Sequence, residues 1–199
     1  WRNCVKILLA QNEFCKGFTI IELMITLALV SVLVTFGIPG FSGLMERNQL
    51  TTGINKFVSS LSLARSEAIK RNQRIGLCAS SNGEQCADVG FENGWLVYVD
   101  NNQNNNRESD EELIWVVSEY GNNFTLRGSS GYENTIFYLP SGRIATNVNG
   151  NIRLCKDNDV KKARMLNLIT TGRVQQARRN DQGIPQDNAG NVIEGCNLS

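Results

Sequence analysis

Near its N-terminus the chain has a long apolar stretch, and apolar residues then recur at the spacing of a helix. Residues 18–38 form a run of 21 residues in which Glu22 is the one charged side chain. This length predicts a helix that spans a bilayer, which needs about 20 residues. Over residues 39–72, apolar residues recur at spacings of three and four, as is typical of an amphipathic helix with one buried face. We therefore expect one helix over about residues 19–71, kinked at Pro39.

Beyond the helix, short runs rich in β-branched and aromatic residues alternate with turn residues. Eight strands are predicted, at residues 74–80, 94–100, 112–119, 123–127, 135–140, 151–155, 165–170 and 172–176. Trp95 and Trp115 alternate with aliphatic residues, so we expect both in the core. Consecutive short strands favour antiparallel hairpins packed on the apolar face of the helix, which is an α+β fold. Residues 180–199 are rich in turn residues and predict an irregular tail.

Composition narrows the chemistry chiefly through one missing residue type. The hydrophobic and charged fractions, 41% and 20%, are those of a folded protein, and a net charge of +1 indicates no partner. The chain has no histidine, the commonest general base and metal ligand. We therefore expect no enzyme activity, no zinc site and no cofactor.

The cysteines predict an oxidising compartment. Four of the six lie in the β-rich part without CxxC spacing, which favours two disulfides over a metal site. Three pairings are open. We favour Cys78 with Cys86, which closes a short local loop, and Cys155 with Cys196, which holds the tail.

Charges around the apolar run predict its orientation. Arg2, Lys6 and Lys16 precede it against Glu13, so this end stays in the cytoplasm and the C-terminal domain lies in the periplasm. A carboxylate inside lipid costs about 2.5 kcal/mol or more, so Glu22 indicates a function rather than a plain anchor.

The segment KGFTIIELMITLALVSVLVTFGIPGF resembles the type IV pilin signature, in which a basic residue and Gly precede Phe and a later Glu. The resemblance implies that a prepilin peptidase removes residues 1–17 as a leader by cutting between Gly17 and Phe18, and that Phe18 is then N-methylated. Glu22 would pair with the new amine on its own chain or a neighbour. Pro39 is a further match. Trp1 stands where Met is expected, so we expect the true start to lie upstream.

The segments GWLVYVDNNQNNN, FYLPSGRI, NIRLC and LITTGRV resemble, in this order, the GspH/FimT group of minor pilins and pseudopilins. The match implies a β domain over residues 73–179 and a single-pass inner-membrane subunit of a type IV pilus or type II secretion pseudopilus. Its implied partners are other pilins, the prepilin peptidase, the inner-membrane assembly platform and membrane lipid. Three roles stay open: a minor pilin in assembly or adhesion, a secretion pseudopilin, and a competence pilin that binds DNA.

The loop DNNQNNNRESDEE has the ligand spacing of a calcium loop at several positions. The candidate ligands are Asp100, Asn102, Asn104 and Glu111. The flanks read as strands rather than helices, so a polar hairpin loop is the favoured interpretation and calcium a secondary hypothesis.

A basic stretch offers a candidate surface for DNA phosphates. Residues 153–179 hold eight bases and two acids, whereas residues 84–119 hold nine acids and one base. The FimT resemblance implies a Gly-Arg-x-Arg motif, but Gly172 and Arg173 are followed by Val and Gln. The candidate DNA-binding residues are Arg173, Arg178, Arg179, Lys161 and Lys162. The alternative is a solvated basic edge, or one that docks on an acidic loop of a neighbouring subunit.

Overall fold

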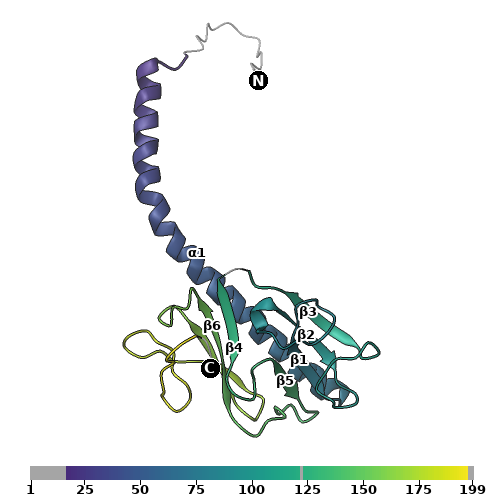
Figure 1. Ribbon diagram of the computed structural model, residues 1–199. Helices are drawn as coiled ribbons and strands as arrows, with labels where there is room; N and C mark the ends of the chain where they lie inside the picture. The colour runs from purple at the N-terminus through teal and green to yellow at the C-terminus, as the bar shows by residue number, and fades with distance from the viewer. Residues whose placement is uncertain (1–16, 122, 197–199) are drawn as a thin grey trace, which may run out of the picture. The chain divides into compact units, whose positions relative to one another are not determined.

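The computed structural model describes residues 17–121 and 123–196, without the side chains of residues 35–42. The long helix α1 (Ile20–Arg71) precedes all the strands (Figure 1). The elements that follow are β1 (Ile75–Ala79), the 3-10 helix η1 (Phe91–Asn93), β2 (Gly94–Val99), β3 (Leu113–Ser118), β4 (Phe124–Gly128), β5 (Thr135–Tyr138), β6 (Gly150–Lys156), β7 (Arg164–Leu168) and β8 (Val174–Gln176). The chain divides into two compact units, Trp1–Leu44 and Met45–Ser199, which are described separately below.

The predicted α+β class, the long helix and all eight predicted strands are confirmed. The helix continues without a break through residue 39. The side chain of Pro39 and the leader residues before Gly17 lie outside the described residues, so the kink and the leader stay predictions.

The strands form two antiparallel sheets. One has the order β3-β2-β1-β5 and the other the order β4-β6-β7-β8. A single hydrophobic core joins both sheets to one face of α1. That face consists of Leu50, Ile54, Phe57, Leu61, Ala64 and Ala68, each 1% exposed or less. The three- and four-residue spacing therefore identified the buried stripe, and residues on both flanks of that stripe remain accessible.

The two strand tryptophans have different environments. Trp95 in β2 is fully buried, its indole N–H donates to the Ser60 hydroxyl at 2.9 Å, and its ring packs edge-on against Phe57. Trp115 in β3 is 52% exposed, so the prediction that it lies in the core is wrong. The physical reason is position: β3 is the edge strand of its sheet, and a neighbouring strand covers it on one side only.

Gly53 lets an aromatic ring approach the helix closely. Any Cβ at this position would overlap the ring of Tyr120, whose hydroxyl donates to the backbone carbonyl of Gln49. The ring also packs edge-on against Phe124 at the start of β4. This contact ties the segment between β3 and β4 to α1.

Two disulfides join the pairs favoured by their spacing. Cys78 in β1 bonds to Cys86 in the following loop, and Cys155 in β6 bonds to Cys196 across a separation of 41 residues. Cys155, Cys196, Met165 and Ile193 form a small buried cluster of their own. The tail from residue 180 has no regular strand within the described part, but the bridge and this cluster fix it against the second sheet.

We predict that the second disulfide contributes more to stability than the first. Closing the longer loop restricts the unfolded chain more, so replacing Cys155 and Cys196 with Ser should lower the unfolding free energy by about 4 kcal/mol, against about 2.5 kcal/mol for Cys78 and Cys86. Urea unfolding of the two double variants measures the difference. Equal losses would show that loop entropy does not govern these bridges.

Candidate functional sites

The first turn of α1 places Glu22 close to the predicted cleavage point. Thr19 is the residue before the helix, and its hydroxyl accepts a hydrogen bond from the backbone N–H of Glu22 at 3.2 Å. This is the N-cap half of a Thr-x-x-Glu capping pattern. Gly17 and Phe18 lie just outside the helix and both are exposed. The cap therefore fixes the start of the helix at Ile20, two residues before Glu22.

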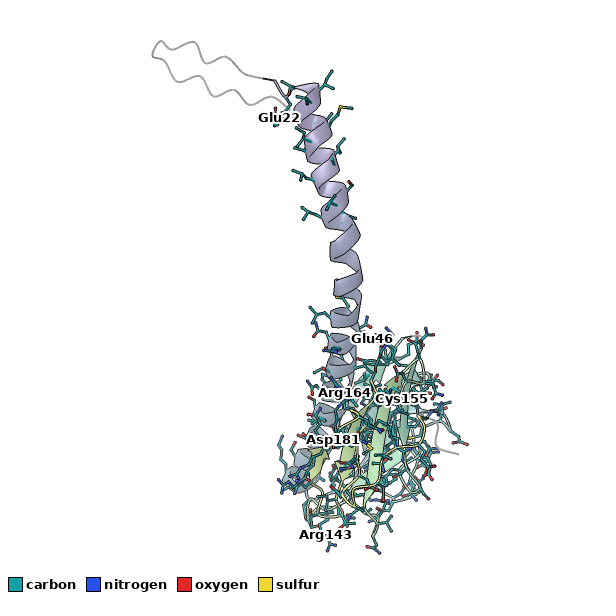
Figure 2. All side chains as sticks on the ribbon, turned by 90° about the vertical axis from the view of Figure 1, so that its left-hand side faces the viewer. Glu22, Glu46, Arg143, Cys155, Arg164 and Asp181 are labelled. Atoms are coloured by element: carbon teal, nitrogen blue, oxygen red, sulfur yellow. A yellow bond between two sulfur atoms is a disulfide. The ribbon has the colours of Figure 1, made fainter. Side chains whose placement is uncertain are left out.

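Glu22 is surrounded by exposed apolar side chains (Figure 2). Phe18 is 83% exposed and Ile21 is 68% exposed. Between residues 17 and 44, Glu22 is the only charged residue in the sequence. Such a surface is stable only when lipid or other protein covers it, and the lone carboxylate then needs a cation there.

No helix in the described part of the chain meets both the length and the hydropathy expected of a membrane span.

The Asn-rich loop after β2 is organised around a buried carboxylate. Asp100 is 1% exposed, and its carboxylate lies 3.1 Å from the guanidinium of Arg74. Burial raises the pKa of the Asp100 carboxyl, and the Arg74 charge opposes that rise. Glu111, also buried, accepts from the backbone N–H groups of Asn101 at 2.9 Å and Glu108 at 3.1 Å. These contacts between buried carboxylates and the loop stabilise its conformation.

The same loop keeps part of the geometry expected of a calcium loop. The side-chain oxygens of Asn102 and Asn104 accept from backbone N–H groups two residues later, and Asn105 has a φ of 68°. Within the described residues, however, His, Cys, Asp and Glu side chains form no group of three placed to hold a metal. Arg74, which the sequence analysis missed, is the cation next to Asp100. Calcium binding stays a prediction.

The five candidate DNA-binding residues divide into two groups. All five residues are exposed, and Lys161, Arg173 and Arg178 form the first group. Arg179 instead donates to the backbone carbonyls of Lys161, Gly183 and Ala163. Its pKa is lowered by burial and by the nearby charges of Arg164 and Arg47. Lys162 pairs with Glu46 of α1 at 3.1 Å. Arg179 is exposed, but its guanidinium is engaged in holding the tail in place, so we do not expect it to replace the missing second arginine of the motif.

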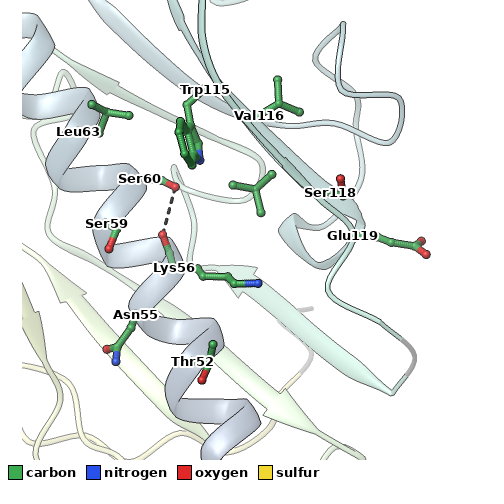
Figure 3. A pocket seen from close by; sticks show the side chains of 11 residues that line it. Thr52, Asn55, Lys56, Ser59, Ser60, Leu63, Trp115, Val116, Ser118 and Glu119 are labelled. Atoms are coloured by element: carbon green, nitrogen blue, oxygen red, sulfur yellow. Dashed lines mark hydrogen bonds between the residues drawn. The ribbon is translucent and has the colours of Figure 1, made fainter.

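A groove of about 780 Å³ runs between α1 and the edge strand β3 (Figure 3). Lys56, Ser59 and Leu63 of the helix face Trp115 of β3 across it. Val116, the next residue along the strand, is 40% exposed. The groove thus joins an apolar wall to a polar helix flank, and sequence alternation alone did not indicate it.

We predict that the Arg74–Asp100 pair matters more for stability than the nearby Arg71–Glu112 pair. Removing the partner of a fully buried carboxylate leaves an uncompensated charge, so Arg74→Gln should lower the unfolding free energy by about 3 kcal/mol. Arg71→Gln is the matched control and should cost about 1 kcal/mol or less, because the Glu112 side chain is 59% exposed and the other partner of Arg71, Glu67, keeps an ion pair with Lys70 at 3.5 Å. Chemical unfolding measures both.

The calcium hypothesis gives the same variant a second readout. If the loop binds calcium, millimolar calcium should stabilise Arg74→Gln more than the unaltered chain, because the metal replaces the lost cation. No calcium effect on either protein would exclude the site.

Comparisons with known proteins match both parts of the chain. The family model described as type II transport protein GspH matches residues 53–172, more than half of the chain. The model described as prokaryotic N-terminal methylation motif matches residues 14–38.

Similar sequences carry pilin names. A fimbrial protein of Pseudomonas aeruginosa is 35% identical over 82 residues, which cover 41% of this chain and 52% of that protein. The type IV major pilin protein PilE of Neisseria gonorrhoeae is 32% identical over 121 residues, which cover 56% of this chain and 72% of PilE. The chain thus spans about half the length of the first of these relatives.

A solved structure shares the fold. The type IV minor pilin FimU of Pseudomonas aeruginosa superposes with a TM-score of 0.56 at 14% identity, covering 77% of this chain and 99% of FimU. At this identity the likeness concerns the fold alone, namely a long helix packed on antiparallel sheets. Taken with the matched N-terminal motif and the β-region model, these findings establish that the chain belongs to the GspH family of type IV pilin-like proteins.

Proposed function

We propose that the chain is a minor pilin or pseudopilin, a structural subunit of a type IV pilus or type II secretion pseudopilus rather than an enzyme. The observation that carries this proposal is the isolated carboxylate of Glu22, four residues after Phe18, on the first part of a helix where no other residue up to Leu44 is charged and the large apolar side chains up to Val34 are exposed. A cut after Gly17 creates an amine on Phe18. That amine is the cation that a carboxylate in an apolar setting requires.

The proposal assigns a role to each part of the chain. Residues 1–17 are a leader that prepilin peptidase removes, and residues 18–38 hold the subunit in the inner membrane before assembly. Residues 39–72 continue the helix, and the β domain over 73–179 with its tail lies in the periplasm. The methylated Phe18 and Glu22 then set the register against neighbouring pilins, with the assembly platform driving extraction from lipid.

Pilus assembly and type II secretion place the same physical requirements on a subunit. Both need an apolar helix that leaves lipid for a filament core and a folded domain on the outside. Within this proposal we assign the subunit a role in starting or capping the filament, because its fold resembles that of a protein named a minor pilin. The two disulfides support a periplasmic location, since such bonds persist in oxidising compartments.

We predict that Glu22→Gln blocks assembly but not processing. The variant should still be cut before Phe18, because the cleavage point lies outside the helix, but its recovery in sheared filaments should fall about tenfold or more with the loss of the charge pair. Mass spectrometry of the N-terminus and immunoblots of the filament fraction measure the two steps separately. Glu84→Gln, a change at an exposed loop carboxylate, is the matched control.

Undiminished incorporation of Glu22→Gln would remove the charge-pairing account. A native protein that keeps residues before Phe18 would remove the filament-subunit proposal as a whole.

A competence pilin that binds DNA is the second candidate function. Exposed Lys161, Arg173 and Arg178 favour it, because surface cations can neutralise the phosphates of a nucleic-acid backbone. Arg179 and Lys162 make contacts within the fold, so fewer cations are available to bind DNA.

We predict that, if the chain has this second function, it binds duplex DNA without sequence preference and its affinity for DNA falls steeply as the salt concentration rises. Arg173→Ala with Arg178→Ala should reduce the slope of log affinity against log salt by about two, because each of the two arginines neutralises one phosphate. Arg179 is left unaltered because its contacts are structural. Binding curves of the double variant that match the unaltered chain at every salt concentration would exclude these residues as the DNA site.

A further inference from the structure

Two turns that lie 30 residues apart in the sequence have the same backbone design. They are residues 139–143, after β5, and residues 169–173, between β7 and β8. In each, the N–H of the first residue donates to the carbonyl of the closing arginine, and the glycine N–H donates back to the first carbonyl. Gly142 and Gly172 have φ values of 75° and 84°, a region that favours glycine. Each turn therefore ends by presenting an arginine, Arg143 or Arg173.

The fold brings the two turns together around Arg65 of α1. A Cβ on Gly172 would overlap the backbone carbonyl of Gly142, so the turns touch. The same Cβ would lie 3.1 Å from Nε of Arg65, and a Cβ on Gly142 would lie 3.3 Å from that atom. The absence of side chains at both glycines is what leaves room for the guanidinium.

The guanidinium of Arg65 has hydrogen-bond donors that are weakly satisfied or unsatisfied in this position. Its Nη2 donates to the Thr171 carbonyl at a long 3.3 Å, while its buried Nε has no hydrogen-bond partner among the described residues. The Tyr138 hydroxyl is also buried and lacks a partner within the same described part of the chain. Buried donors without acceptors are unfavourable by about 1–3 kcal/mol each, so an acceptor brought from outside would be stabilising.

These groups line one groove of about 350 Å³. Arg65 and Arg173 supply its positive charge, Ser62 and Ser66 lie along its helix side, and none of the described residues lining it is acidic. Apolar side chains form much of the remaining wall, namely Val58, Leu61, Ile69 and Val174. The site thus combines two guanidinium groups, with no acidic side chain among the described residues around them, and an apolar surface.

We propose that this groove binds a carboxylate on an acidic, partly apolar peptide segment of a neighbouring subunit. Guanidinium groups form charge-assisted hydrogen bonds with carboxylates, and the apolar wall suits the side chains beside such a carboxylate better than a sugar–phosphate backbone. Charge complementarity is available within the protein itself: Asp100 and Glu111 are buried, but the acidic stretch 84–119 also carries exposed carboxylates at Glu84, Asp88, Glu108, Asp110 and Glu119. The identity of the partner as a subunit rests on the proposed function, whereas the binding chemistry does not.

The test uses the full-length chain in detergent micelles with ¹⁵N-labelled arginine. The Nε–H signal of Arg65, identified by its loss in Arg65→Gln, is followed by NMR as a synthetic peptide with the sequence of residues 107–114 is added at constant ionic strength. We expect a saturable shift, and affinity about tenfold weaker in Arg173→Gln, which removes one charge-assisted hydrogen-bond donor from an exposed turn. Arg47→Gln, an exposed arginine of α1 outside the groove, is the matched control and should bind normally.

Further arms identify the ligand class. A peptide with Asn and Gln in place of its acids should cause no saturable shift. A saturable shift with that neutral peptide, or none with the acidic one, would overturn the proposal. Tighter binding of inorganic phosphate or duplex DNA would overturn the assignment to a carboxylate. Because isolated protein is used, a negative result here leaves the Glu22 experiment unaffected, and a failure of Glu22 pairing leaves this one unaffected.

Discussion

The folded domain depends on burying one stripe of α1 against two sheets at once. Six apolar residues of α1, from Leu50 to Ala68, are almost completely inaccessible to solvent. Residues of both sheets pack on them in one core. Fully burying side chains of this kind contributes about 1.5–3 kcal/mol each for the larger ones. The two sheets share no strand, so the helix is the element that both of them require.

This constraint also determines where surfaces remain for partners. A helix that buries one stripe between two sheets keeps its two flanks at the sheet margins. On one flank, Lys56 and Leu63 line a groove with Trp115 of the edge strand β3, and the surface combines apolar side chains with a polar helix flank. On the other flank, Arg65 lies under two glycine turns, and the surface is cationic. The chemistry of the two grooves differs because the sheet margins differ: one is an open strand edge and the other a pair of tight turns.

The sequence predicted local structure well and environment less well. Periodicity identified α1 and the eight strands because it reflects local backbone geometry and a buried face. It did not separate one sheet from two, nor the exposed edge position of Trp115 from the central position of Trp95, since both tryptophans show the same alternation. The Arg74–Asp100 pair and the Arg65 groove escaped notice because their members are far apart in sequence, and a lone arginine beside an apolar stripe looks like an ordinary solvated residue.

The apolar residues of α1 have different surroundings in the two units of the chain. From Leu50 to Ala68, one apolar stripe of α1 is buried by the chain's own strands, and Met45 and Ile69 on either side of it are about half exposed. Between Phe18 and Val34, the apolar residues are exposed and the chain supplies nothing to cover them in the described structure. Lipid can cover such a surface, and so can the helices of other subunits, but only a partner with a fixed cation satisfies the carboxylate of Glu22. Under the proposed function, a charge that is unfavourable in lipid and favourable beside an amine would therefore drive the helix from the first environment towards the second.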